Sequence, residues 1–198
     1  MTPEWLLTSA VILVSLTSLS LLILRDWRWN IAALAIQYAG VLALVLPAWP
    51  LELAVTKMVA GWMAGAILGV AMAGATTSAP KDARPPFAER LFTFLTTGLV
   101  ALVLISIVPN SDRWLAQAHL ASRWGGFILI GMGLLHLGLS NHPLRVILGL
   151  LTSLSGFEIL YAAVETSTLV AGFLAAVTLG LALVCAYMLA APVLEERP

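Results

Sequence analysis

Residues 141–167 read NHPLRVILGLLTSLSGFEILYAAVETS, and this stretch decides the fold. It begins with polar residues, continues as an apolar run for most of a membrane's thickness, and ends with polar residues again. A run of about 20 largely apolar residues is long enough to cross a bilayer as a helix. The stretch therefore predicts a membrane-spanning helix that carries one acidic residue, Glu158, among apolar neighbours.

The rest of the chain has the same character. Of its 198 residues, 61% are hydrophobic and 10% are charged, whereas charged residues make up about 25% of a soluble domain. The formal net charge is zero, so no basic surface for nucleic acid is expected. The apolar runs do not alternate in hydrophobicity as barrel strands do. The sequence therefore predicts an all-α integral membrane protein.

Seven transmembrane helices are predicted from the apolar runs. They cover roughly residues 5–24, 30–48, 51–75, 91–109, 124–140, 144–164 and 168–190. Prolines and polar residues separate them, and the longest separation follows the third run. We therefore expect an N-terminal three-helix part at residues 1–79, a proline-rich cytoplasmic loop at 80–90 and a C-terminal four-helix part at 91–198.

Loop cations predict how the helices are oriented, because cytoplasmic loops carry an excess of Lys and Arg. One side of the membrane collects seven cations: Arg25, Arg28, Lys81, Arg84, Arg90, Arg145 and Arg197. The other side collects Arg113 and Arg123. We therefore expect a multi-pass protein of the cell's inner (plasma) membrane, with its N-terminus outside and its C-terminus in the cytoplasm.

Two charged side chains, Lys57 and Glu158, lie inside predicted spans at matched depths. At ~1.5 Å per residue they are roughly 9 and 10 Å from the outer ends of the third and sixth spans, so they can pair if these spans touch. A charge at mid-membrane costs at least ~2.5 kcal/mol, and such groups are usually paired or functional. One interpretation of Glu158 is a proton-relay carboxylate. A second is structural, either as the buried partner of Lys57 or as a protonated acid hydrogen-bonded to a neighbour. A third places it at the lipid boundary.

Two further polar residues fall in the spans. His136, in GMGLLHLGLSNHP, is a candidate proton relay near neutral pH, although a helix-packing or interface role is favoured. Gln37 is expected to hydrogen-bond between helices.

Three glycines, Gly61, Gly65 and Gly69, recur every four residues on the same stripe as Lys57. Small residues at that spacing allow two helices to approach closely. No catalytic residue, cofactor ligand or metal site is predicted, and the only cysteine, Cys185, lies in an apolar run. The glycines are therefore assigned to helix packing.

Residues 129–165, LIGMGLLHLGLSNHPLRVILGLLTSLSGFEILYAAVE, resemble the C-terminal part of the hydrogenase-4 membrane component E family. That region is similar to chain K of bacterial NADH:quinone oxidoreductase. The shared pattern is an apolar helix, a short polar turn with a basic residue, here SNHPLR, and a helix that begins ILGLL. The last helix, LVAGFLAAVTLGLALVCAYML, resembles the third helix of chain K, so the last three helices resemble the three-helix unit of chain K.

The N-terminal part also resembles component E. RDWRWNIAALAIQYAGVLAL looks like the basic turn and glutamine-containing helix of that family, and ELAVTKMVAG looks like its third span. One departure concerns the membrane glutamates that mark the second and third helices of chain K. The matched positions here are Leu151 and a residue near Ala176. Glu158, two turns beyond Leu151, does not inherit the family's role by position.

The resemblance implies a non-catalytic membrane subunit of a complex I-like or group 4 NiFe-hydrogenase-like oxidoreductase. Such a subunit is an accessory of the enzyme and supports helix packing around a proton or ion path. Its expected partners are antiporter-like membrane subunits, a membrane anchor, a peripheral electron-transfer arm and the lipid bilayer. Quinone, iron–sulfur and NiFe centres would belong to those partners, and no cofactor is expected on this chain.

The alternative is a small independent transporter, or a structural membrane protein without ion coupling. A transporter of this size is expected to show internal symmetry or paired broken helices. The sequence shows no convincing repeat between its two parts.

Overall fold

The computed structural model describes residues 3–75 and 87–195, and the side chains of residues 3–74 and 91–191. Its helices are α1 (Glu4–Ile23), α2 (Trp27–Val45), α3 (Leu51–Ala75), α4 (Phe87–Asn110), α5 (Leu120–Gly138), α6 (Pro143–Ala162) and α7 (Thr168–Glu195), with the short 3-10 helix η1 (Ser111–Arg113). All seven α-helices are long and apolar enough to cross a membrane. The prediction of an all-α protein with seven such helices is confirmed.

Several helix boundaries differ from the predicted ones. The fourth helix begins at Phe87 and the fifth at Leu120, each four residues earlier than expected. Most of the predicted loop at 80–90, with Lys81 and Arg84, lies outside the described residues, as does Arg197. The side chain of Arg90 is also outside them.

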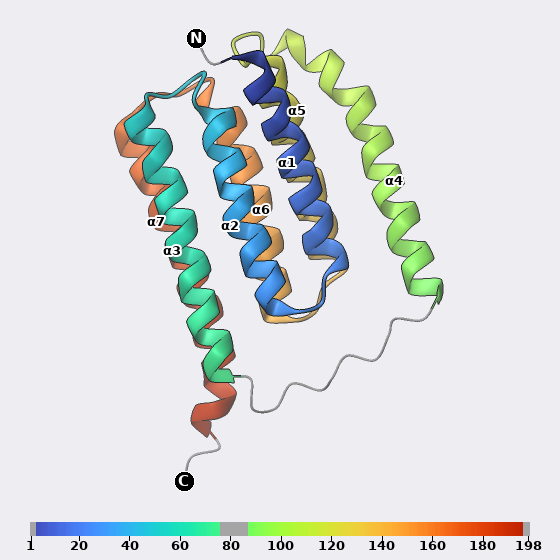
Figure 1. Ribbon diagram of the computed structural model, residues 1–198, viewed down its shortest axis with the longest axis vertical. Helices are drawn as coiled ribbons and strands as arrows, with labels where there is room; N and C mark the ends of the chain where they lie inside the picture. The colour runs from blue at the N-terminus through green and yellow to red at the C-terminus, as the bar shows by residue number, and fades with distance from the viewer. Residues whose placement is uncertain (1–2, 76–86, 196–198) are drawn as a thin grey trace.

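Six helices form two layers of three (Figure 1). One layer contains α1, α2 and α3, and the other contains α5, α6 and α7. Each helix of the second layer packs behind its counterpart in the first, α5 on α1, α6 on α2 and α7 on α3. The N-terminal and C-terminal parts predicted from the sequence therefore share one helical bundle.

The fourth helix lies at the edge of this bundle, where it packs mainly on α5 (Figure 1). Most of its large apolar side chains are exposed, among them Phe94, Leu99 and Leu102. Such a surface suits a hydrocarbon environment.

The tightest helix contact, between α5 and α6, depends on two pairs of glycines. A Cβ added to Gly133 would lie 2.8 Å from the carbonyl oxygen of Gly149, and one added to Gly156 would lie 2.5 Å from that of Gly126. In each helix the two glycines are seven residues apart, so they share one face. Because the helices are antiparallel, both pairs meet, and the backbones touch at two levels.

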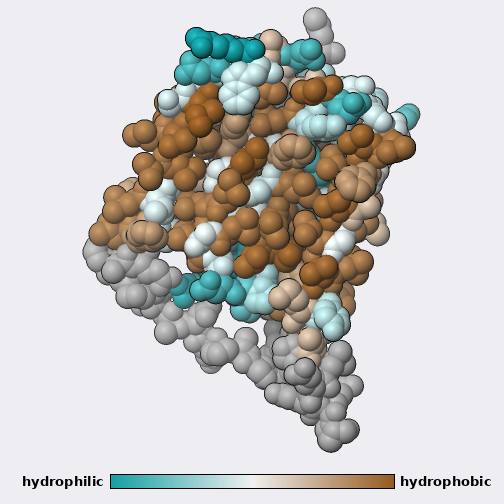
Figure 2. All heavy atoms as spheres, turned by 180° about the vertical axis from the view of Figure 1, so that it is seen from behind, coloured by the Kyte–Doolittle hydropathy of each residue, from teal (hydrophilic) through white to brown (hydrophobic). Residues whose placement is uncertain are grey.

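The odd number of helices places the start of α1 and the end of α7 at opposite ends of the bundle (Figure 1). We call the end where α1, α3, α5 and α7 begin the N-terminal end, and the other the C-terminal end. Hydrophilic atoms gather near the two ends, with a broad hydrophobic band between them (Figure 2). This distribution fits a multi-pass membrane protein.

Among the described side chains, the interior contains two apolar clusters. The one nearer the N-terminal end includes Val41, Ala54, Ile159 and Ala171. The one nearer the C-terminal end includes Leu34, Ala64, Leu151 and Ala182. On each of α2, α3, α6 and α7, the chain passes from one cluster to the other, and polar side chains lie at or near the transition.

Candidate functional site

Seven polar side chains meet where the two apolar clusters join, and we call them the buried polar cluster. They are Gln37 and Tyr38 from α2, Lys57 from α3, Thr152, Ser155 and Glu158 from α6, and Thr178 from α7. None is more than 5% exposed. Polar groups at this depth need partners because lipid offers none.

An ion pair lies at the centre of the cluster. The Nζ atom of Lys57 contacts Oε2 of Glu158, and these side chains are 5% and 1% exposed. The two helices are not extensive neighbours within the described residues, since α3 packs on α2 and α7 while α6 packs on α5, α7 and α2. The long Lys57 side chain bridges the distance. The structure thus brings the two charges together without the close packing of the third and sixth spans that we had required.

Two other helices complete the surroundings of the Lys57 ammonium. It donates a hydrogen bond to Thr178 Oγ1 at 3.0 Å, and that hydroxyl in turn donates to the Leu174 carbonyl oxygen at 3.0 Å. It also lies 5.3 Å from the centre of the Tyr38 ring, within reach of a cation–π interaction. Groups from α2, α6 and α7 therefore hold one cation from α3.

Two oxygen acceptors in the cluster lack hydrogen-bond donors. Oε1 of Glu158 and Oε1 of Gln37 are buried and accept no hydrogen bond from the described protein atoms. Buried acceptors of this kind are usually hydrated. The Gln37 amide does donate to Thr152 Oγ1 at 3.3 Å, which is the kind of interhelical bond expected from the sequence.

The third helix packs on α2 through its glycine stripe. A Cβ at Gly61 would lie 2.3 Å from atoms of the Tyr38 ring, so only glycine leaves room for the ring there. At Gly65 and Gly69 the nearest atoms belong to Ile31, at ordinary distances of 3.8 and 3.6 Å. The close approach is therefore limited to Gly61, where it holds the ring that faces Lys57.

His136 lies apart from the cluster. It is in the last turn of α5, near the C-terminal end, and is 3% exposed. Its Nε2 atom has no hydrogen-bond partner among the described atoms. The structure therefore does not bring His136 together with Lys57 and Glu158.

Four members of the cluster were missed by the sequence analysis: Tyr38, Thr152, Ser155 and Thr178. A signal for two of them was present, because Thr152, Ser155 and Glu158 follow one another at intervals of three residues. This spacing places them along one side of a helix. No comparable pattern identifies Tyr38 or Thr178.

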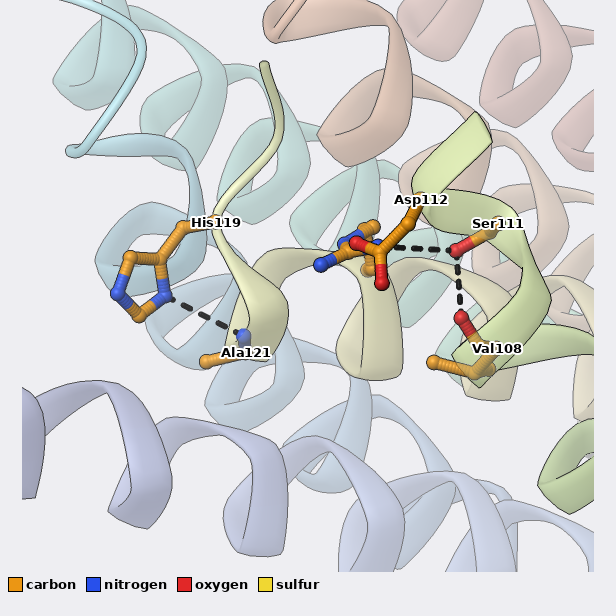
Figure 3. Close-up of polar contacts among 6 residues, drawn as sticks. Val108, Ser111, Asp112, His119 and Ala121 are labelled. Atoms are coloured by element: carbon orange, nitrogen blue, oxygen red, sulfur yellow. Dashed lines mark hydrogen bonds and ion pairs between the residues drawn. The ribbon is translucent and has the colours of Figure 1, made fainter. Parts of the chain in front are cut away.

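Arg123, expected in an outer loop, instead lies within α5 and is 7% exposed. Its Nη1 atom pairs with Asp112 and lies 3.4 Å from Ser111 Oγ. The Ser111 hydroxyl donates to the Val108 carbonyl oxygen at 2.6 Å (Figure 3). The burial has a physical reason, since Asp112 neutralises the guanidinium where α5 begins beside the end of α4.

A second contact fixes the start of α5. His119, the N-cap residue, accepts a hydrogen bond from the Ala121 amide at 3.3 Å through Nδ1 (Figure 3). Such caps satisfy amides that have no partner within the helix. Together with Arg123, this cap defines the course of the chain between α4 and α5.

The arrangement offers proton and ion-pair chemistry in a buried site. Protonating Glu158 would remove its charge and leave Lys57 held by Thr178 and Tyr38. Among the described residues, no group of three or more His, Cys, Asp or Glu side chains could hold a metal ion. Comparisons with protein families, with curated proteins and with solved structures gave no match.

Proposed function

We propose that this chain is a non-catalytic membrane subunit of a complex I-like or group 4 NiFe-hydrogenase-like oxidoreductase, where it packs beside a proton or ion path. The observation that carries the proposal is the Lys57–Glu158 pair buried inside an apolar bundle. Well-packed apolar residues of similar volume stabilise a protein as well as a buried ion pair does, or better. Charges retained inside a membrane protein are usually paired and lie beside an ion pathway.

The resemblance of residues 129–165 to hydrogenase-4 component E and to chain K supports the class of complex. It implies antiporter-like membrane subunits as neighbours, with electron transfer carried by other subunits. Glu158 does not occupy either matched glutamate position, so its proposed role is to hold Lys57 and the four helices around it. By the distribution of loop cations, the N-terminal end faces the outside of the inner membrane.

The proposal is tested by purifying the affinity-tagged full chain from its own cells in mild detergent. We expect antiporter-like subunits and a peripheral redox arm to co-elute and to be identified by mass spectrometry. A tagged, unrelated seven-helix protein from the same membranes is the control for non-specific recovery. Elution as a stable monomer that transports a solute after reconstitution would overturn the proposal.

A small independent transporter is the second candidate. It is favoured by a pocket of about 350 Å³ that is lined in part by the end of α6. These lining residues are close in sequence to Glu158. The purified chain alone in liposomes would then take up protons or a solute, and Glu158→Gln would abolish the uptake.

A further inference from the structure

The pocket at the N-terminal end reaches close to the buried ion pair. Its walls come from the α2–α3 connection, the segment before α5, the first turn of α5, the end of α6 and the α6–α7 connection. Gln117, His119 and Thr166 are exposed lining residues, whereas Ile159 and Ala162 are buried lining residues. Ala118 and Ser122 are also buried lining residues, so the pocket is open and polar outside and mainly apolar inside.

The deep part of the pocket lies about one helical turn from Glu158. Ala162 follows Glu158 by four residues in α6, so the two share a face and differ in depth by about 6 Å. Ile159 is the next residue along the helix. Ile159 and Ala162 belong to the apolar cluster nearer the N-terminal end, with Val41, Leu44 and Ala54. This cluster lies between the pocket and the level of the carboxylate.

The other direction is closed. Toward the C-terminal end, α6 continues with Leu151, Leu148 and Leu144, which are 0%, 0% and 3% exposed. They belong to an apolar cluster with Leu34 and Leu68 from the facing helices. Glu158 lies fifteen residues from Pro143 at the start of α6 but only four from Ala162 at its end. The path through the bundle is therefore about 22 Å toward the C-terminal end and about 6 Å toward the pocket.

We propose that this pocket is a water-filled vestibule through which Glu158 exchanges protons with one side of the membrane only. The proposal deepens the function proposed above and rests on it for the biological role of the exchange. Water from the vestibule would hydrogen-bond to Oε1 of Glu158. This atom is buried and has no hydrogen-bond partner among the described protein atoms. The carboxylate takes a proton from hydronium, which leaves water and a neutral acid, and Lys57 keeps its bond to Thr178.

One-sided access has a functional consequence. A group that equilibrates with one side, and is sealed from the other, responds to the pH of that side without conducting protons across the bilayer. The strength of the Lys57–Glu158 pair, and with it the link between α3 and α6, then depends on the proton concentration at the N-terminal end.

The test is thiol accessibility in the membrane, with the full chain in its own complex. Replacing the only cysteine, as Cys185→Ala, removes the native thiol. Single cysteines are then introduced as Thr166→Cys at the mouth, Ala162→Cys at the floor, Leu148→Cys in the sealed cluster and Leu102→Cys on the exposed face of α4. A charged, membrane-impermeant thiol reagent is applied to either side, and it reacts only where water reaches the thiol.

We expect Ala162→Cys to react from the same side as Thr166→Cys, at least tenfold faster than Leu148→Cys or Leu102→Cys, and not from the opposite side. Failure of Ala162→Cys to react, or reaction from the opposite side, would overturn the vestibule. If Ala162→Cys does not accumulate in membranes, Ala163→Cys replaces it, since this half-buried residue lines the same pocket.

Failures of the two proposals can be told apart. Labelling at Ala162 in a chain that purifies without partners would retain the vestibule and reject the complex. A chain that co-purifies with its partners but is not labelled at Ala162 would retain the complex and reject the vestibule.

Discussion

Lys57 of α3 and Glu158 of α6 form a buried ion pair although their helices are not extensive neighbours. The contact depends on the length of the lysine side chain and on Tyr38 and Thr178, which hold its ammonium between α2 and α7. The pair therefore links all four of these helices.

The first prediction concerns this pair. Glu158→Gln and Lys57→Met should each lower the amount of assembled chain, because one charge is left buried without its partner, at a cost of ~3–5 kcal/mol. The double variant leaves neither charge and should recover a substantial part of the assembly. The measurement is the yield of complex on size-exclusion chromatography in mild detergent.

The same variants separate a structural role from a relay. Proton pumping per electron should change little in whatever complex survives, because the proposed role of Glu158 is to hold Lys57. Normal assembly of Glu158→Gln with loss of pumping would show that Glu158 is a relay group.

The second prediction concerns Gly61, where an added methyl group would clash with the Tyr38 ring. Gly61→Ala should destabilise the fold by about 1 to 3 kcal/mol, as overpacking typically does. Gly69→Ala, on the same stripe but with only ordinary contacts, is the matched control. Cys185, fully buried and the only cysteine, reports unfolding on heating through its reaction with a thiol-specific dye. Equal midpoints for the two variants would contradict the contact.

The third prediction concerns the glycine pairs of α5 and α6. Gly133→Ala should push the helices apart, because its methyl group would meet the backbone of α6, and a loss of about 1 to 3 kcal/mol is expected. Gly138→Ala, in the same helix, faces open space and should be tolerated. The Cys185 dye assay measures both, and a stable Gly133→Ala variant would mean that the backbones are further apart.

The fourth prediction concerns orientation. Reporters fused after Arg197 and within residues 80–86 should both be cytoplasmic, because four helices separate these sites. A reporter inserted after Gln117 should lie on the opposite side. If the reporter after Arg197 and the reporter within residues 80–86 lie on different sides, one helix between them does not cross the membrane.

The sequence determined the number and approximate positions of the helices. Whether a segment can span a bilayer depends on its own length and hydrophobicity, which are local properties, and all seven runs appear as long helices. The matched depths of Lys57 and Glu158 also followed from counting residues along two helices. Resemblance to a family, rather than geometry, supplied the expected class of complex.

Only the tertiary structure decided which helices surround the ion pair. Tyr38 and Thr178 become its partners because α2 and α7 are rotated to present them, and the rotation depends on packing along several helices at once. The same holds for Arg123, which the loop-cation argument placed in water and Asp112 holds in a buried pair. Depth along one helix can be counted from its sequence, but the neighbours at that depth depend on how all the helices pack.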